Sequence, residues 1–261
     1  MSNDYHFAAA RQKKIINLID ENQSVKLSEL RVLFGVSEAT IRRDLVALEG
    51  KKTLTRTYGG AVANLMVSED SSNEDRSITN VEEKLKISKA ACTLISEGQT
   101  VFIDSGTTAI QLASVIPKNM NCIYVTNCRG VANELFRRGI MSFYLIGGSY
   151  LAINDSFVGT LAVDVIRSLS FDISFLCTSG VDVHRQQISL RSDVYRQSQR
   201  EVIAVSQQNY VLADHSKFNA KAFFSSATFD QIDGVITSNL ISNEMRDKLA
   251  KFPMKVIYAG G

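Results

Sequence analysis

From residue 80 onward, short apolar runs alternate with segments of helical periodicity, and this alternation limits the fold more than any other feature. Short apolar strands separated by helices are typical of a parallel sheet that helices cover on both faces. The strand candidates are residues 100–104, 122–126, 142–147, 172–178, 209–214, 234–237 and 255–260. The helical patterns are residues 81–96, 108–116, 129–138, 161–169, a stretch within 193–206, and 243–252. This part of the chain is therefore predicted to be an α/β domain with a mainly parallel sheet.

The composition supports a folded globular protein and excludes several other classes. Of 261 residues, 45% are hydrophobic and 21% are charged, which is enough apolar material for a sizeable core. No apolar stretch approaches the ~20 residues of a membrane-spanning helix, and the N-terminus lacks the apolar run of an export signal. We therefore expect a cytoplasmic protein without a membrane partner.

The cysteines and histidines predict neither disulfides nor a metal site. The four cysteines form no C-x-x-C pair, which favours free thiols in a reducing compartment. The three histidines are far apart in the sequence, so we expect no metal. Glycine motifs for dinucleotides or nucleoside triphosphates are also missing, so we expect no cofactor.

The first 62 residues predict a small winged helix-turn-helix domain. Helical periodicity covers residues 8–21, 27–34 and 37–49. Gly35 is a natural helix end, and Ser37 is a candidate cap for the helix that follows. Residues 54–62 then alternate around a Gly-Gly turn, which indicates a two-stranded wing. The polar, acidic stretch 63–79 reads as a linker, so the α/β domain is expected to occupy residues 80–261.

Charge and helix geometry point to DNA as the partner of this N-terminal domain. Residues 1–63 carry ten Lys and Arg against seven Asp and Glu, whereas the remainder is close to neutral. The second helix of a helix-turn-helix enters the major groove with its N-terminal residues. We expect Arg11 to lie opposite the apolar face of the first helix, and Asp44 to orient Arg43 or nearby backbone. The candidate DNA-binding residues are Ser37, Glu38, Ala39, Thr40, Arg42, Arg43, Lys51, Lys52, Arg56 and Tyr58.

A helix bundle with basic residues on a solvated face, and no nucleic-acid partner, is the alternative interpretation of the same charges. The wing and the attached α/β domain favour DNA over that alternative. Helix-turn-helix proteins bind two half-sites, so a homo-oligomer is expected, either a dimer or a tetramer.

Small polar clusters follow several predicted strands, and the carboxyl ends of parallel strands meet at one edge of a sheet. The sharpest cluster is D-S-G-T-T, where Gly106 permits a tight turn and Thr107 opens a helix. The free N–H groups of a helix start favour an anion such as phosphate, and Lys217 could add a positive charge. The alternative is that Ser105 or Thr107 only caps the helix. Asp104, Asp182 and Asp214 could act as acids or bases, yet no catalytic motif accompanies them.

Two series of motifs resemble the DeoR family of bacterial transcriptional regulators. The run FGVSEATIRRDLVALEGKKTLTRTYGGAV closely resembles the N-terminal winged helix-turn-helix of that family. The family's sensor domain is matched, in order, by FIDSGTTAIQLA, YVTNCRGVANEL, LIGGSY, SFVGTLAVDVI, CTSGVD and VLADHSKF. The resemblance covers nearly the whole chain.

The resemblance implies a repressor of sugar or carbohydrate catabolism that senses a phosphorylated sugar. It also implies a sensor fold similar to ribose-5-phosphate isomerase. By motif, the phosphate would be held by Ser105, Gly106, Thr107 and Thr108. The rest of the effector site would be lined by Asp104, Thr126, Asn127, Gly147, Gly148, Asp182 and Lys217.

The sequence departs from the family pattern in the stretch QQISLRSDVYRQSQREV. The family usually has a threonine and then a glutamate there, where this chain offers Ser189 and, approximately, Asp193. Cys128 stands where many members have serine. Three arginines make the loop basic, which favours a different or more acidic sugar. The competing functions are a sugar-phosphate isomerase or transferase with an accessory N-terminal domain, and a protein-binding adaptor.

Overall fold

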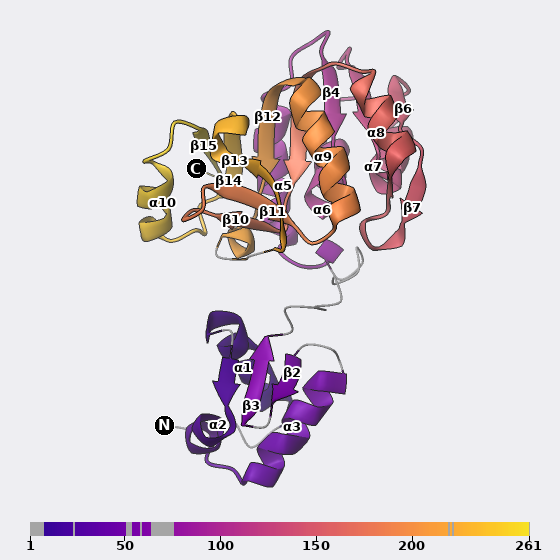
Figure 1. Cartoon of the computed structure of the whole chain (residues 1–261). Helices are drawn as coiled ribbons and strands as arrows, with labels where there is room; N and C mark the ends of the chain where they lie inside the picture. Colours follow the sequence, from indigo (N-terminus) through magenta and orange to yellow (C-terminus); the bar gives the residue numbers. More distant parts are fainter. Residues whose placement is uncertain are drawn as a thin grey trace. The chain divides into compact units, whose positions relative to one another are not determined.

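The computed structural model describes residues 8–22, 24–50, 54–57, 59–63, 76–218, 220 and 222–260. The chain divides into two compact units, Met1–Ser72 and Asn73–Gly261, and each is described by itself (Figure 1). Within the described residues, no helix is both long and apolar enough to cross a membrane.

The N-terminal unit is a helix-turn-helix with a small antiparallel sheet, as predicted. Its elements are α1 (Ala8–Asn22), β1 (Ser24–Lys26), α2 (Leu27–Phe34), α3 (Glu38–Gly50), β2 (Leu54–Thr57) and β3 (Gly60–Ala63). The predicted wing is present as β2 and β3, and β1, which was not predicted, pairs with the other side of β3. All three helices contribute to one core, which includes Ile15, Leu30 and Ile41.

The turn between α2 and α3 forms for the reasons that the sequence indicates. Gly35 adopts a left-handed conformation with φ of 62°, and its N–H donates to the carbonyl of Arg31 at 3.0 Å. The Ser37 hydroxyl then accepts a hydrogen bond from the Thr40 N–H at 3.2 Å and so caps α3. These two residues set the geometry that exposes the start of α3.

Arg11 and Asp44 do not lie where the sequence analysis placed them. Arg11 is only 4% exposed, and its Nε donates to Asp44 Oδ2 at 2.5 Å, so both expectations for these residues were wrong. Arg11 precedes Ile15 and Ile19 at intervals of four residues, which puts it on the buried face of α1. The two charges therefore form a buried pair that joins α1 to α3.

The C-terminal unit is built on a seven-stranded sheet in the order β15-β14-β12-β9-β4-β5-β6, in which every pairing is parallel. This confirms the predicted α/β class, because all seven strand candidates are in this sheet. The strands are β4 (Thr100–Ile103), β5 (Ile123–Thr126), β6 (Phe143–Leu145), β9 (Phe171–Cys177), β12 (Ser206–Leu212), β14 (Gly234–Ser238) and β15 (Lys255–Ala259).

Helices cover both faces of this sheet. On one face α5, α6 and α7 pack on a core that includes Val101, Ile103 and Phe175. On the other face α8, α9 and α10 pack on a core that includes Phe102 and Leu176. The helices are α5 (Val81–Cys92), α6 (Thr107–Val115), α7 (Arg129–Arg137), α8 (Thr160–Arg167), α9 (Asp193–Val205) and α10 (Asn243–Leu249). The helix predicted to run through residue 96 thus ends at Cys92.

Two smaller sheets were not predicted. One is the antiparallel pair β7 (Ser149–Leu151) and β8 (Ser156–Val158), and the other has the order β10-β11-β13. The strands of that second sheet are β10 (Gly180–Asp182), β11 (Gln187–Leu190) and β13 (Phe224–Thr228).

Candidate functional site

The predicted recognition surface lies on the first turns of α3. Glu38, Ala39, Arg42 and Arg43 are exposed, whereas Ile41, Leu45 and Leu48 are buried on the opposite side of the helix. Ser37 is exposed and Thr40 is half-buried at the start of the helix. The surface therefore combines hydroxyl and guanidinium donors, which are the groups that bind base edges and phosphates.

Two of the predicted DNA-binding arginines form exposed ion pairs within the chain. Arg42 lies 2.8 Å from Glu38, and Arg56 lies 2.6 Å from Glu49. The hydrogen bonds from Arg56 hold the pKa of the Glu49 carboxyl below its usual value. Exposed pairs contribute little stability, so phosphates can displace these carboxylates at small cost. Lys51, Lys52 and Tyr58 lie outside the described residues.

The D-S-G-T-T segment forms a tight loop between β4 and α6. Gly106 has φ of 144°, and a Cβ at this position would come within 2.9 Å of the Cys177 sulfur, so only glycine fits. Thr107 begins α6, and no side chain caps that helix. The Ser105 hydroxyl is buried and has no hydrogen-bond partner among the described residues. A buried polar group without a partner is costly, which points to a ligand or water at this place.

Asp104, which precedes this loop, uses both carboxylate oxygens within the chain. Oδ1 accepts from the Tyr195 hydroxyl, and Oδ2 accepts from the Cys177 N–H at 3.0 Å and from Gln199 Nε2 at 2.9 Å. Burial raises the pKa of the Asp104 carboxyl, and these hydrogen bonds offset part of the rise. The network joins the ends of β4 and β9 to α9, and it holds the loop in place.

Further buried polar atoms without partners lie next to the loop, at the end of β5. Thr126 is fully buried and its Oγ1 accepts from the Cys128 N–H, while Asn127 Nδ2 donates to the Phe157 carbonyl at 3.0 Å. Asn127 Oδ1 and the Ser156 hydroxyl have no partner among the described residues. Cys128 pairs with Ser156 in an antiparallel bridge. The unpartnered Asn127 oxygen thus follows β5, the strand that pairs with β4 in the sheet.

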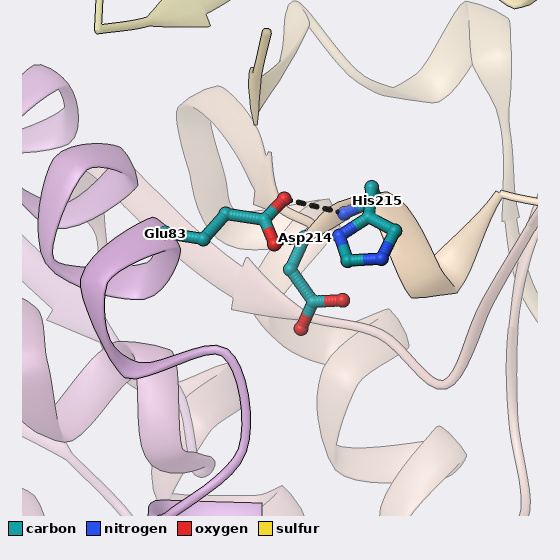
Figure 2. Close-up of side chains that lie close together, drawn as sticks. All are labelled: Glu83, Asp214 and His215. Atoms are coloured by element: carbon teal, nitrogen blue, oxygen red, sulfur yellow. Dashed lines mark hydrogen bonds and ion pairs between the residues drawn. The ribbon is translucent and has the colours of Figure 1, made fainter. Parts of the chain in front are cut away.

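Asp214, His215 and Lys217 follow β12, where a short 3₁₀ helix spans His215–Lys217. Figure 2 shows Glu83 of α5 reaching towards Asp214 and His215. Glu83 accepts hydrogen bonds from the His215 N–H and from His215 Nδ1, both at 2.7 Å, and from the Ser238 hydroxyl at 2.5 Å. These bonds tie α5 to the loop that carries Lys217.

This Glu83 cluster is the part of the site that the sequence analysis missed. Potential metal-ligand atoms of Glu83, Asp214 and His215 lie within 4.8 Å of one another, although the residues are far apart in the sequence. Donors of the chain already occupy the Glu83 carboxylate, and Lys84 and Lys217 bring positive charge to the same region. The arrangement is that of a hydrogen-bonded clamp. The available signal was the spacing of Glu83 from Ile87, which places the carboxylate on the buried face of α5.

The remaining predicted effector residues follow β6 or lie at the end of β10. Gly147 is exposed after β6, and Gly148 approaches the Val158 carbonyl so closely that a Cβ would meet it at 2.6 Å. Asp182 Oδ1 accepts from the N–H groups of His184 and Arg185. A cavity of about 240 Å³ is lined by Val181, Asp182, Val183, His184, Ala220, Met245 and Lys248. Of the predicted effector residues, only Asp182 lines this cavity.

The segment that departs from the family pattern is also held by internal contacts. Ser189 is buried in β11, where its hydroxyl accepts from the Ala222 N–H at 3.1 Å. Asp193 opens α9 and pairs with Arg196 at 2.5 Å. Both side chains that stand in place of the family's threonine and glutamate are therefore occupied by contacts within the chain.

Comparisons with known proteins match both units. A DeoR-like helix-turn-helix domain matches residues 11–66, and the DeoR C terminal sensor domain matches residues 79–239. The transcriptional repressor AccR of Agrobacterium fabrum is 35% identical over 88% of this chain and 89% of its own length. A putative aga operon transcriptional repressor of Escherichia coli O157:H7 is 32% identical over 96% of this chain and 93% of its own length. A lactose phosphotransferase system repressor of Staphylococcus epidermidis is 32% identical over 88% of this chain and 91% of its own length.

Among solved structures, a ribose 5-phosphate isomerase A from Methanocaldococcus jannaschii aligns with 54% of this chain and 55% of its own. The sequence identity is 16% and the TM-score is 0.41, a likeness that says nothing about the site. The matching family and the named relatives are regulators, so the enzyme alternative is not favoured.

Proposed function

This chain belongs to the DeoR family of DNA-binding transcriptional regulators, and we propose that it represses a sugar or carbohydrate catabolic operon under the control of a phosphorylated sugar. The names of the relatives support the first part, since they include repressors of an aga operon and of a lactose phosphotransferase system. The observation that carries the second part is the uncapped start of α6 beside unpartnered buried oxygens.

In this proposal, α3 reads the operator. Ser37, Thr40, Arg42 and Arg43 reach base edges and phosphates from the exposed side of the helix, while Glu38 and Ala39 face the groove beside them. Arg56, with Lys51, Lys52 and Tyr58, supplies phosphate contacts from the wing. Two half-sites require two copies of this unit, so the protein acts as a homo-oligomer, a dimer or a tetramer, in the cytoplasm.

The effector site is proposed at the carboxyl ends of β4, β5 and β12. The N–H groups at the start of α6 and the hydroxyls of Ser105, Thr107 and Thr108 would bind the phosphate, because a helix start favours negative charge. The sugar or the outer oxygens of the phosphate would be contacted by Thr126, Asn127 and Lys217. Asp104 would position the loop through Tyr195 and Gln199, and would not bind effector. Gly147, Gly148 and Asp182 would shape the surroundings of the site.

Replacing Ser105 by alanine tests the site, because the Ser105 hydroxyl has no partner within the described chain. Ser105→Ala is expected to leave the melting temperature of the unliganded protein unchanged or slightly raised, since an unsatisfied buried group is removed. Sugar-phosphate affinity is expected to fall by about tenfold, the usual loss for a hydrogen bond to a charged group. The measurement is a thermal-shift screen of pentose and hexose phosphates on the wild type, followed by titration of both proteins.

The matched control is Ser114→Ala on α6, the helix that follows the loop. The Ser114 hydroxyl donates to the Gln111 carbonyl at 2.7 Å, outside the loop, so sugar-phosphate affinity should not change. Equal affinities for wild type and Ser105→Ala would show that the loop does not bind the phosphate. If no sugar phosphate shifted the wild-type melting temperature, the proposed effector class would be wrong.

A further inference from the structure

Residues in α5 and just before it contact two segments of the proposed effector site, the loop after β12 and the first turn of α6. Asn80, Lys84 and Ser88 are spaced by four residues, so they line up along the helix. Asn80 Nδ2 donates to Asp214 Oδ1 at 3.3 Å, and the Ser88 hydroxyl donates to the Thr108 carbonyl at 3.1 Å. Lys84, between them, therefore lies between the loop after β12 and the first turn of α6.

The Lys84 ammonium is buried and bonds to the backbone just before its own helix. Its Nζ donates to the carbonyls of Arg76 at 2.5 Å and Thr79 at 2.7 Å, and the residue is 5% exposed. An ammonium has three N–H groups, and the described residues provide hydrogen-bond acceptors for two of them. Residues 76–79 are the first described part of the C-terminal unit, and through them the chain continues to the DNA-binding unit.

Positive charge gathers around this ammonium. Burial lowers the pKa of Lys84, Asp214 partly offsets that effect, and Lys217 and Arg76 lower the pKa further. Buried charge is costly unless it is paired, and the Asp214 carboxylate offsets only part of the cost for Lys84. An anion bound beside Lys217 would therefore attract Lys84 strongly.

The neighbouring Glu83 holds the start of α5 through bonds that do not involve the Lys84 side chain. Glu83 is bonded to His215 on one side and to Ser238 on the other, which anchors the first turns of the helix to two strand ends. A shift of the ammonium would thus change its own hydrogen bonds without moving the helix.

Building on the proposed effector site, we propose that Lys84 binds the anionic group of the effector and thereby releases the carbonyls of Arg76 and Thr79. Occupancy of the site then loosens residues 76–79, the segment that leads to the DNA-binding unit. The ammonium is the element with two arrangements: bonded to the backbone when the site is empty, and turned to the anion when it is filled.

Hydrogen exchange on the full-length wild type tests this directly. With a saturating sugar phosphate from the thermal-shift screen, peptides covering residues 76–84 are expected to exchange at least about threefold faster, because their hydrogen-bond support is weakened. Peptides from α10 serve as the internal control and should not change. Unchanged or slower exchange over residues 76–84 would overturn the proposal, and this test needs no variant.

Lys84→Met, compared with Lys86→Met, tests the contact with the anion. Both remove one lysine from α5, but Lys86 is exposed. Lys84→Met should bind the same sugar phosphate at least about tenfold more weakly, as expected for loss of a charge-assisted bond, and should show fast exchange over residues 76–84 without ligand. Lys86→Met should match the wild type.

Lys84→Arg, which keeps the charge, replaces the methionine variant if that variant does not fold, and should retain binding with an altered exchange response. Wild-type affinity in Lys84→Met would refute the role of Lys84 and leave the proposed effector site standing. Failure of the wild type itself to bind any sugar phosphate would refute both proposals.

Discussion

Replacing Arg42 and Arg43 together with alanine is expected to lower operator affinity at least about 100-fold, because each arginine contact to a base or phosphate contributes roughly 1–3 kcal/mol. Both side chains are exposed on α3, so the fold should be unaffected and the melting temperature should stay within about a degree. The operator can be obtained by selecting duplexes from a random pool with the wild-type protein. Affinity is then measured by fluorescence anisotropy over a series of salt concentrations.

Lys13→Ala supplies the control for charge. Lys13 is exposed on α1 and is not one of the proposed DNA-binding residues, so its loss should change operator affinity only by about twofold. The salt dependence of the arginine variant should be shallower, by about one unit of slope for each phosphate that the variant no longer binds. Near-normal affinity in the arginine variant would exclude α3 as the reading helix.

Asp44→Ala is expected to destabilise the N-terminal unit by about 3–5 kcal/mol, the usual cost of breaking a buried ion pair. The change removes the carboxylate that pairs with Arg11 and that also accepts from Gln12 Nε2 at 3.2 Å. A small domain has little stability in reserve, so this unit should unfold at 37 °C and DNA binding should be lost. Calorimetry of the full chain should show the transition of the C-terminal unit unchanged.

Two variants separate the buried pair from surface charge. Glu38→Ala breaks the exposed pair with Arg42 and should cost less than about 1 kcal/mol. The double change Arg11→Met with Asp44→Leu replaces the buried charges by apolar groups and should recover most of the stability. A loss below about 1 kcal/mol in Asp44→Ala would mean that the pair does not support the unit.

Sequence patterns were sufficient for the parallel sheet and the helix-turn-helix, because short apolar runs alternate with helical segments in the one and turn residues separate the helices in the other. All seven strands of the parallel sheet and the helix-turn-helix were predicted from apolar spacing, Gly35 and Ser37. The position of Arg11 was also available from its spacing with Ile15 and Ile19, but its charge argued for an exposed position. Burial became possible only because Asp44, 33 residues away, compensates that charge.

The candidate site was only partly predictable, for a physical reason. Motif and strand position indicated the loop at Gly106, since glycine geometry and a helix start are local properties. The contacts that position this loop and the loop after β12 join residues about 90 to 130 apart, as between Asp104 and Tyr195 or Glu83 and His215, and no local pattern predicts them. The buried Lys84 belongs to the same group, because its neighbours come from separate strands and loops.

The most direct test of regulation by a phosphorylated sugar is the affinity of the wild-type protein for its selected operator, measured by anisotropy with and without the sugar phosphates that raise its melting temperature. We expect at least one of these compounds to change the operator affinity by about fivefold or more, the lower range of allosteric coupling. Operator affinity that stays constant at saturating concentrations of every such compound would contradict the account.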